Sequence, residues 1–524
     1  MKNQTIVSIS QILEEMNKNI SLEQSLLKIF PTLKINRGLP RLYQRINPSV
    51  SYIKEDFSQM SALKKQLLEK LLLPLYKMGK TEAKICLFTH MMGGFGDLIA
   101  HLEIYKIIIS KYPKTTSILS VPKGFIHNLE HSIVISDDCT PQFFPEEALQ
   151  AIQNSDLIVS LPTYYPHTNE LRKISTARWL NIGEYGFVES HDFSPKSGNY
   201  SMGLHFLELG ILTRKNKEKG DFRTLENQTL LQALFGTTAP KNIDIENYQA
   251  THSLYLAYLI SPIGGAVYLH ALLLSQINQL KIIDICTPDI GWLIQYMKDG
   301  LFLNGPLCIQ EIEIHFDGKI HRRTIAEQGK KVRIICPGPL SDRDFRTLMV
   351  LSEEFIAVRG DQSFSEAVSA NRLFFYDGAQ HARYFIKDLL AMAENKLSHN
   401  QPALSVFRAM NQAFAHNIPE QTTNWVEESY FLEKEPPENI AKKIATALSS
   451  PLTLLGFKQF NETILNEYSC NEAICQLVAR ETTYRFDPDR EAYEKNQINA
   501  FAEGHQSVNE TLQRIASRGR GGGE

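Results

Sequence analysis

One glycine-rich turn carries an acidic side chain at the point where a strand is expected to meet a helix. The run Met92-Gly93-Gly94-Phe95-Gly96-Asp97 follows a strand-like segment and precedes an apolar-periodic, helical one. Glycines such as Gly94 and Gly96 let a backbone approach a ligand closely and leave N–H groups available at the helix N-terminus. Asp97 would either face a ligand at the carboxyl end of a parallel strand or cap the helix, and its position leaves both roles open.

A second turn combines small, polar and cationic residues that could hold a diphosphate. In the run Val358-Arg359-Gly360-Asp361-Gln362-Ser363-Phe364 a helix is expected to begin at or near Ser363, and Arg359 adds a charge that suits phosphate. The helix dipole and the Ser363 hydroxyl would assist the N–H groups of Gln362, Ser363 and Phe364. An ordinary cap by Asp361 or Ser363, with Glu366 completing a capping box, is compatible with that function.

Alternating strand-like and helical segments place the two turns in similar settings. In the first part of the chain, the expected strands are 84–89, 117–121, 133–135 and 157–161, with a helix at 98–110. In the second part, the expected strands are 254–260, 281–286, 331–336, 355–358 and 373–376, with helices at 266–277, 345–352 and 363–370. Repeated alternation of this kind predicts two parallel-sheet, Rossmann-like α/β domains.

The type of pattern divides the chain into five expected regions. Residues 1–80 and 416–517 have helical periodicity, and 81–250 and 251–415 are the two Rossmann-like domains. Residues 518–524 are expected to form a disordered tail because they have nothing apolar to bury.

Composition excludes several classes of protein. The 55 Lys and Arg against 58 Asp and Glu give a formal charge of -3, which argues against nucleic-acid binding by bulk charge. No segment approaches the roughly 20 apolar residues of a membrane span, and no signal-peptide pattern is present, so a cytoplasmic location is expected. Seven dispersed cysteines predict neither a disulfide framework nor a metal site, and the pair Asp342 and Asp344 is interpreted as a helix cap.

Together the two turns resemble the GT-B glycosyltransferases, in which an acceptor half and a sugar-nucleotide half face each other across a cleft. The stretch Gly96-Asp97-Leu98-Ile99-Ala100-His101-Leu102 resembles the N-terminal Gly-Asp motif of the heptosyltransferases and of the elongation-factor-P arginine rhamnosyltransferases. The Asp of that motif is implicated as a general base in both families, so the resemblance implies this role for Asp97. It also implies that 81–250 is the acceptor domain and 251–415 the sugar-nucleotide domain.

The second half resembles the rhamnosyltransferases in more places. Tyr258 is similar to an aromatic residue that packs on the nucleotide base in that family. Similarity to the family's donor-binding segment is found at 344–348 and 358–364. There Asp361 takes the place of a Glu and Gln362 that of an Asp. Because Gly93 stands where the family has a second Asp, rhamnose and elongation factor P are not carried over to this chain.

The resemblance implies a metal-independent, inverting glycosyltransferase with a nucleotide-diphosphate sugar as donor, no cofactor, and an acceptor that could be a protein side chain. Its predicted catalytic residues are Asp97 and Asp361. The residues predicted to bind the donor are Gly94, Gly96, Tyr258, Arg359, Gly360, Gln362, Ser363 and Phe364. A sugar-nucleotide epimerase or hydrolase of similar fold and a non-catalytic, effector-type binding protein are the alternatives. Delivery into a host cell by a bacterium fits the Lys-, Asn- and Ile-rich composition.

Overall fold

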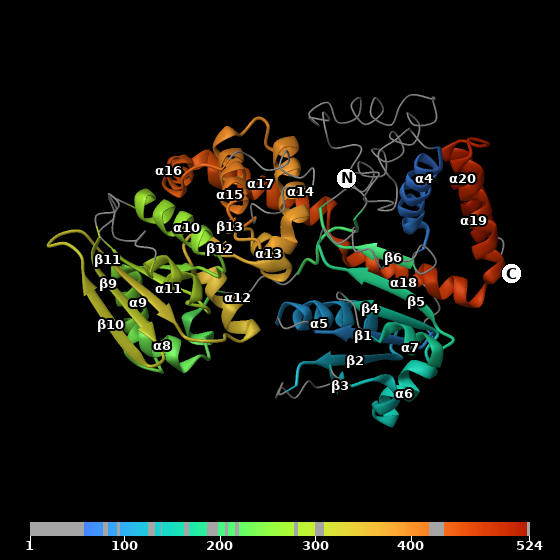
Figure 1. Ribbon diagram of the computed structural model, residues 1–524, viewed down its shortest axis with the longest axis horizontal. Helices are drawn as coiled ribbons and strands as arrows, with labels where there is room; N and C mark the ends of the chain where they lie inside the picture. The colour runs from blue at the N-terminus through green and yellow to red at the C-terminus, as the bar shows by residue number, and fades with distance from the viewer. Residues whose placement is uncertain are drawn as a thin grey trace. The chain divides into compact units, whose positions relative to one another are not determined.

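The computed structural model describes most of the chain as helices and strands (Figure 1). The described residues are 57–76, 82–91, 95–123, 132–137, 139–161, 167–185, 198–204, 208–214, 220–276, 281–298, 309–418 and 434–520. The chain forms two compact units, of which the first comprises Met1–Leu212 with Asn466–Glu524 and the second Thr213–Leu465. Among the described residues, none of the helices combines the length and the apolar character that crossing a lipid bilayer requires.

A parallel sheet of six strands forms the centre of the first unit. Its strands are β1 (Ile85–His90), β2 (Thr115–Val121), β3 (Ser132–Ser136), β4 (Leu157–Leu161), β5 (Arg178–Gly183) and β6 (Gly198–Ser201). They lie in the order β3-β2-β1-β4-β5-β6, so the chain passes from one side of β1 to the other between β3 and β4. This is the strand order of a Rossmann sheet, and it confirms the predicted α/β class for this unit.

Helices lie on both faces of the first sheet, and further helices pack on those helices and on one another. They are α4 (Phe57–Leu72), α5 (Phe95–Ile109), α6 (Glu146–Gln153), α7 (Thr168–Ile174), α18 (Cys470–Phe486), α19 (Pro488–Ala502) and α20 (Val508–Arg520), with 3-10 turns η1 (Leu73–Leu75) and η2 (Pro141–Phe143). On one face, Phe88 of β1 and Ile152 of α6 belong to one buried apolar cluster. On the other face, His101 of α5 lies 2.7 Å from the Thr89 hydroxyl and 2.6 Å from the Ser117 hydroxyl. Because burial lowers the pKa of His101 to about 3, this helix is joined to its sheet by a neutral imidazole.

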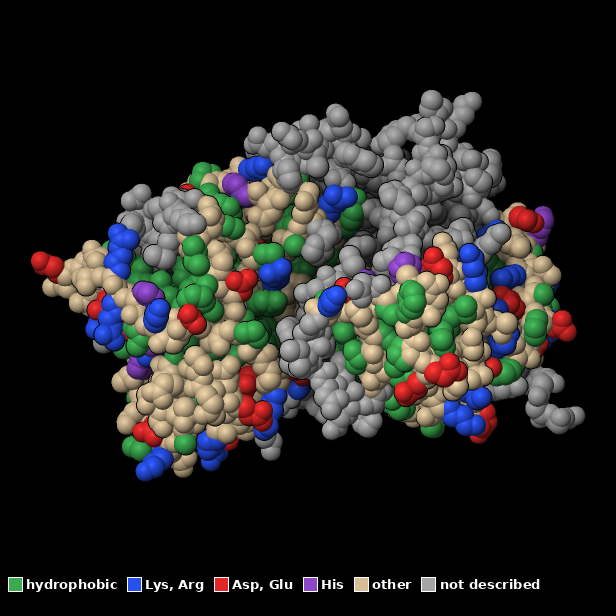
Figure 2. Space-filling view, turned by 60° about the horizontal axis from the view of Figure 1, so that its bottom comes forward, with side chains coloured by type: hydrophobic (Ala, Val, Ile, Leu, Met, Phe, Trp, Pro, Cys, Tyr) green, Lys and Arg blue, Asp and Glu red, His purple; other side chains and the backbone are tan. Residues whose placement is uncertain are grey.

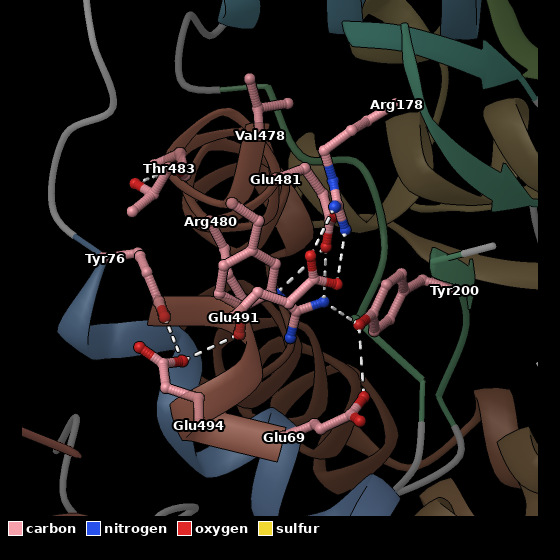
Figure 3. A network of polar contacts seen from close by, with 12 residues as sticks. Glu69, Tyr76, Arg178, Tyr200, Val478, Arg480, Glu481, Thr483, Glu491 and Glu494 are labelled. Atoms are coloured by element: carbon pink, nitrogen blue, oxygen red, sulfur yellow. Dashed lines mark hydrogen bonds and ion pairs between the residues drawn. The ribbon is translucent and has the colours of Figure 1, made fainter. Parts of the chain in front are cut away.

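A buried ion-pair network anchors the C-terminal helices to the first sheet (Figure 3). Arg178, at the start of β5, pairs with Glu481 of α18 at 2.9 Å and with Glu491 of α19 at 2.7 Å. Arg480 of α18 pairs with Glu481 at 3.0 Å and donates a hydrogen bond to the Tyr200 hydroxyl on β6. Only 4% of Arg480 is exposed, so these groups satisfy one another away from water. The network joins segments that lie far apart in the sequence into one unit.

A second set of parallel strands forms the centre of the second unit. These are β7 (His252–Leu256), β8 (Ile282–Cys286), β9 (Ile309–Phe316), β10 (Lys319–Thr324), β11 (Lys330–Cys336), β12 (Phe355–Val358) and β13 (Leu373–Tyr376). Five strands lie in the order β10-β9-β11-β8-β7, with β10 antiparallel to β9, and β12 pairs with β13. A parallel bridge between Ala257 and Ala357 places β12 beside the end of β7. The order β11-β8-β7-β12-β13 is again Rossmann-like, which confirms the second predicted sheet.

The helices of the second unit pack on this sheet and on one another. They are α8 (Gln228–Phe235), α9 (Asn242–Thr251), α10 (Pro262–Ser275), α11 (Gly291–Lys298), α12 (Asp342–Leu351), α13 (Gly360–Ser369), α14 (Arg383–Lys396), α15 (Gln401–Ala415), α16 (Pro437–Leu448) and α17 (Pro451–Glu467), with 3-10 turns η4 (Phe222–Thr224) and η5 (Gln380–Ala382). Helix α16 packs against both α10 and α15 (Figure 1). On the face shown in Figure 2, acidic and basic side chains are intermingled, in keeping with the nearly even charge count.

The boundary between the units differs from the one predicted near residue 250. Helices α8 and α9 belong to the second unit, where the rings of Phe222, Phe235 and Tyr248 pack on one another at centroid distances of 5.2 to 5.5 Å. The Tyr248 hydroxyl also donates a hydrogen bond to Asp284 of β8 at 2.8 Å. The predicted helical region 416–517 is likewise divided, because α16 and nearly all of α17 belong to the second unit and α18–α20 to the first.

The predicted disordered tail is wrong for its first residues. Helix α20 continues through Arg520, and the guanidinium carbon of Arg518 lies 4.4 Å from the centroid of the Tyr493 ring. This cation–π contact gives the end of the helix a partner that the local pattern did not reveal. Residues 521–524, and 1–56 of the predicted N-terminal helical region, lie outside the described residues.

Candidate functional site

The first candidate site lies at the carboxyl edge of the first sheet, where the strand order reverses between β1 and β4. Parallel α/β sheets bind ligands at this kind of position. Strand β1 ends at His90, α5 begins at Phe95, and Asp97 lies half-buried in the first turn of α5. Gly96 is exposed and a Cβ there would meet nothing within 4 Å, whereas Gly94 lies outside the described residues. The structure thus puts Asp97 at the strand end where the sequence predicted it.

Polar side chains follow neighbouring strands at the same edge. They are His90 at the end of β1, Ser120 of β2, Asp137 just after β3 and His167 just before α7. His90 is buried and its Nδ1 lies 3.0 Å from the Ser120 hydroxyl. Burial lowers the pKa of His90; His167 adds to this effect and Asp137 opposes it. The sequence prediction missed this group, although His90 directly follows one predicted strand and Ser120 lies near the end of the next.

The second candidate site lies at the corresponding position of the second sheet, between the ends of β7 and β12. The N–H of Tyr258, just past β7, donates to the Ala357 carbonyl of β12 at 2.9 Å. The guanidinium carbon of Arg359 lies 5.9 Å from the centroid of the Tyr258 ring. Phe345 of α12 meets the same ring edge to face, with centroids 5.8 Å apart. The structure therefore brings together Tyr258 and Arg359, both of which were predicted to bind the donor.

The helix that follows Arg359 begins earlier than predicted. Helix α13 starts at Gly360 rather than near Ser363, and Arg359 is its N-cap residue. Gly360 has a φ of +76°, a left-handed conformation that favours glycine. In a helix with this start, the N–H of Phe364 donates to the Gly360 carbonyl. The N–H groups of the first turn that can face a ligand therefore include those of Gly360 and Gln362, and donor binding by Ser363 and Phe364 stays a prediction.

Ser363 and Phe364 also make side-chain contacts within the chain. The Ser363 hydroxyl accepts a hydrogen bond from the Arg359 N–H at 3.0 Å and donates one to the Arg359 carbonyl. It therefore holds the turn that carries Arg359. Phe364 is 0% exposed and packs edge to face against Phe374 and Phe385. Its side chain belongs to the hydrophobic core, whereas the prediction for Phe364 concerned its backbone N–H.

Glu366, which was expected to complete a capping box, is a buried residue of α13 that contacts a residue outside its own helix. Glu366 pairs with Arg214 at 3.2 Å and accepts a hydrogen bond from the Gln362 amide at 3.4 Å. Arg214 also lies 3.3 Å from Asp342 of α12. The Gln362 side chain is thus directed along its own helix, while Asp361 lies half-buried in the first turn. Arg214 is distant in the sequence, so this cluster was not predictable from the local motif.

Glu366 is expected to make the stability of the second unit fall as the pH rises from 4.5 to about 7. Burial raises the pKa of its carboxyl from 4.5 to about 7, with Arg214 opposing the shift and Asp342 adding to it. In this interval the folded chain keeps a proton that the unfolded chain has released, so stability declines by up to about 3 kcal/mol and levels off above that range. The variant Glu366→Gln should remove the decline. Urea unfolding of the unmodified chain and of Glu366→Gln at about pH 5 and about pH 8 measures the decline in stability. Equal declines in the two chains would contradict the expected role of Glu366.

The interpretation of Asp342 and Asp344 as a helix cap is wrong. Ser341 caps α12 by accepting a hydrogen bond from the Asp344 N–H at 3.0 Å. The Asp344 carboxylate instead accepts the Glu226 N–H at 2.8 Å. Within the part of the chain that the structure describes, no three His, Cys, Asp or Glu side chains gather closely enough to hold a metal ion.

Comparisons with known proteins find likeness to solved structures alone. No family model matches the chain, and no curated protein matches its sequence. A glycosyltransferase from Rickettsia africae is 12% identical, with a TM-score of 0.40, over 77% of this chain and 99% of that one. An alpha,alpha-trehalose 6-phosphate synthase from Burkholderia multivorans is 9% identical, with a TM-score of 0.38, over 78% of this chain and 98% of that one.

HepE from Anabaena, solved in complex with UDP, is a further similar structure. It is 12% identical, with a TM-score of 0.37, over 76% of this chain and 98% of its own. Because these identities and TM-scores are low, the function of this chain has to be inferred from its own residues.

Proposed function

We propose that this chain is a glycosyltransferase that moves a sugar from a nucleotide-diphosphate donor to an acceptor. The observation that supports this most is the convergence of Tyr258, Arg359 and the N-terminus of α13 at the point where the second strand order reverses. An aromatic ring offers a flat apolar surface to a base or sugar. A guanidinium and helix N–H groups suit the two phosphates.

The proposed reaction is inverting and needs no metal ion. The acceptor nucleophile attacks the anomeric carbon while Asp97 takes its proton, the bond from that carbon to the phosphate oxygen breaks, and the nucleoside diphosphate leaves. Arg359 and the N–H groups of the first turn of α13 stabilise the negative charge on the leaving phosphate. Asp361 is proposed as a second catalytic residue because its carboxylate belongs to the same turn.

A protein side chain is the acceptor proposed for the first tests. The Asp97 motif resembles that of enzymes that glycosylate a protein arginine, and a nucleophile of that kind must lose a proton to become neutral after the attack. A base is therefore useful in the chemistry. Incubation of the chain with radiolabelled nucleotide sugars and a cell lysate would show the label moving into protein. Label recovered only in free sugar would favour the epimerase or hydrolase alternative.

Arg359→Ala is expected to weaken the binding of a nucleoside diphosphate by about 10- to 100-fold. The variant removes a charge-assisted hydrogen bond to phosphate, which contributes roughly 1.5 to 3 kcal/mol. Isothermal titration with UDP, dTDP, GDP and ADP measures the effect. Arg408→Ala is the matched control, because Arg408 is an exposed residue of α15 that pairs with Glu394 at 3.3 Å.

Two outcomes of this titration would count against the proposal. Failure of the unmodified chain to bind any of the four nucleotides or the corresponding nucleotide sugars would contradict the proposed donor. Equal binding by the unmodified chain and Arg359→Ala would show that the diphosphate lies elsewhere.

A further inference from the structure

A buried carboxylate with no part in the proposed reaction lies beside the candidate donor site. Asp377 is the first residue after β13, and 3% of it is exposed. Its N–H donates to the Val358 carbonyl, at the end of β12, at 2.9 Å. The end of β13 is therefore tied to the end of the strand that leads directly into Arg359.

The Asp377 carboxylate also holds the turn that follows β7. Its Oδ2 accepts the N–H groups of Ile260 at 2.7 Å and of Ser261 at 2.8 Å. Its Oδ1 accepts the Ser261 hydroxyl at 2.7 Å. The Ser261 hydroxyl in turn accepts the Gly264 N–H at 2.8 Å and caps α10. Asp377, Ile260, Ser261 and Gly264 are called the Asp377 clasp below.

Packing inside the Asp377 clasp leaves no room for a side chain at position 264. A Cβ on Gly264 would lie 2.3 Å from Asp377 Oδ1 and 2.6 Å from the Ser261 hydroxyl oxygen, so any side chain there would push the clasp apart. Tyr258 lies two residues before Ile260 and is bonded to β12 through its N–H. The clasp therefore fixes the stretch of chain that sets the position of the Tyr258 ring.

The charge of Arg359, the second predicted donor-binding residue, acts on the Asp377 carboxylate. Burial raises the pKa of Asp377, while its hydrogen bonds to Ser261 and Ile260 and the positive charge of Arg359 act to lower it. The positive charge of Arg359 thus acts on the carboxylate, while backbone and hydroxyl donors bond to its oxygens. None of these three hydrogen bonds involves the Arg359 side chain, because the Asp377 oxygens bond to the turn after β7.

We infer that Asp377 is a positioning residue that holds Tyr258 and Arg359 in the geometry that binds the donor diphosphate. The inference rests on the proposed function for the identity of the ligand. It goes beyond that function because it assigns a role to a carboxylate whose oxygens bond to the turn after β7. A purely structural role predicts a loss of stability alone, whereas a positioning role predicts an additional loss of affinity in chains that remain folded.

The experiment compares Asp377→Asn with Asp284→Asn. Asp284 is a matched control because it is also buried, lies inside β8, and bonds to Tyr248 at 2.8 Å and to Arg333 at 2.7 Å. Both variants are expected to lower the melting temperature. Well below both melting temperatures, Asp377→Asn should weaken nucleoside diphosphate binding by about tenfold, the low end of what loss of a supporting partner costs at metal sites. Asp284→Asn should bind like the unmodified chain.

Ser261→Ala supplies a second, milder test of the same contact. It removes one of the three hydrogen bonds to Asp377, so it should weaken binding in the same direction. Its effect should not add to that of Asp377→Asn, because both act through one clasp. Unchanged binding by Asp377→Asn, or equal weakening by Asp284→Asn, would overturn the inference.

Hydrogen exchange separates failure of this inference from failure of the proposed function. Without any ligand, Asp377→Asn should speed amide exchange in residues 258–265, and Asp284→Asn should not. If the unmodified chain binds none of the nucleotides tested, the proposed function fails, and exchange in 258–265 still decides whether Asp377 holds the turn. Unchanged exchange there in Asp377→Asn would overturn the positioning role regardless of the ligand.

Discussion

Replacing Asp97 with asparagine is expected to lower the rate of sugar transfer by about 10²- to 10⁴-fold while donor affinity stays unchanged. Asparagine has nearly the same shape and keeps one acceptor oxygen, but it cannot act as a base. Asp97 lies in the first turn of α5, and the donor residues lie on β7, β12 and α13. Loss of the base should therefore affect the chemical step and leave the titration with nucleoside diphosphates as it was.

Glu103→Gln is the matched control for Asp97→Asn. Glu103 is another carboxylate of α5, and it pairs with the exposed Lys106 at 3.0 Å. The control should transfer sugar at the rate of the unmodified chain. Incorporation of radiolabelled sugar into acceptor protein measures all three chains. A full rate in Asp97→Asn would show that Asp97 acts as a helix cap rather than as the base.

Replacing Arg480 with methionine is expected to lower the free energy of unfolding of the first unit by about 3 to 5 kcal/mol. Methionine fills much of the same volume, but it removes one of the two cationic partners of Glu481 and leaves the Tyr200 hydroxyl without its guanidinium donor. Burial raises the pKa of Glu69, and Arg480 opposes that shift, so the variant should also drive Glu69 toward its neutral form. Figure 3 shows Arg480 between these groups.

Lys106→Met provides the comparison for the loss of Arg480. The pair of Lys106 with Glu103 is largely exposed on the lysine side, and pairs of this kind contribute roughly 1 kcal/mol or less. Urea unfolding followed by hydrogen exchange measures the stability of the first sheet separately from that of the second unit, because peptides from each are analysed individually. Equal losses in Arg480→Met and Lys106→Met would mean that the network of Figure 3 does not hold the C-terminal helices.

The strands that the sequence predicted best are those buried along their whole length. Segments such as 84–89 and 355–358 are short, apolar and bounded by turn residues, and they became β1 and β12. Strand β5 was missed because Arg178 and Asn181 interrupt its apolar run, and the ion pairs that bury Arg178 come from helices nearly three hundred residues later. Long-range partners of this kind leave no trace in a local pattern.

The hairpin of β9 and β10 was missed for another reason. Every residue of β10 is exposed, so the strand has no buried face to reveal it. Asp317 and Gly318 both have positive φ, at 51° and 69°, and an Asp-Gly pair between extended segments is a typical hairpin signal. The sequence therefore contained the turn, although not the burial pattern that usually accompanies a strand.

The candidate donor site was predictable in outline and not in the direction of its side chains. Arg359 follows one predicted parallel strand, 355–358, and Tyr258 falls in the last part of another, 254–260, which the structure ends at Leu256. Because strand ends of one sheet share an edge, the pattern favours their proximity. Whether a residue one turn later faces ligand or core depends on where the helix starts. Helix α13 starts at Gly360, three residues before the predicted start, and the Phe364 side chain lies in the core.

The central claim is that a nucleoside diphosphate binds at the ends of β7 and β12. A crystal structure of the chain soaked with a mixture of UDP, dTDP, GDP and ADP tests it most directly. The account predicts that one nucleotide is retained, with its phosphates beside Arg359 and the first turn of α13 and its base or sugar near the Tyr258 ring. Phosphates bound at any other strand edge, or no nucleotide retained at saturating concentrations, would contradict it.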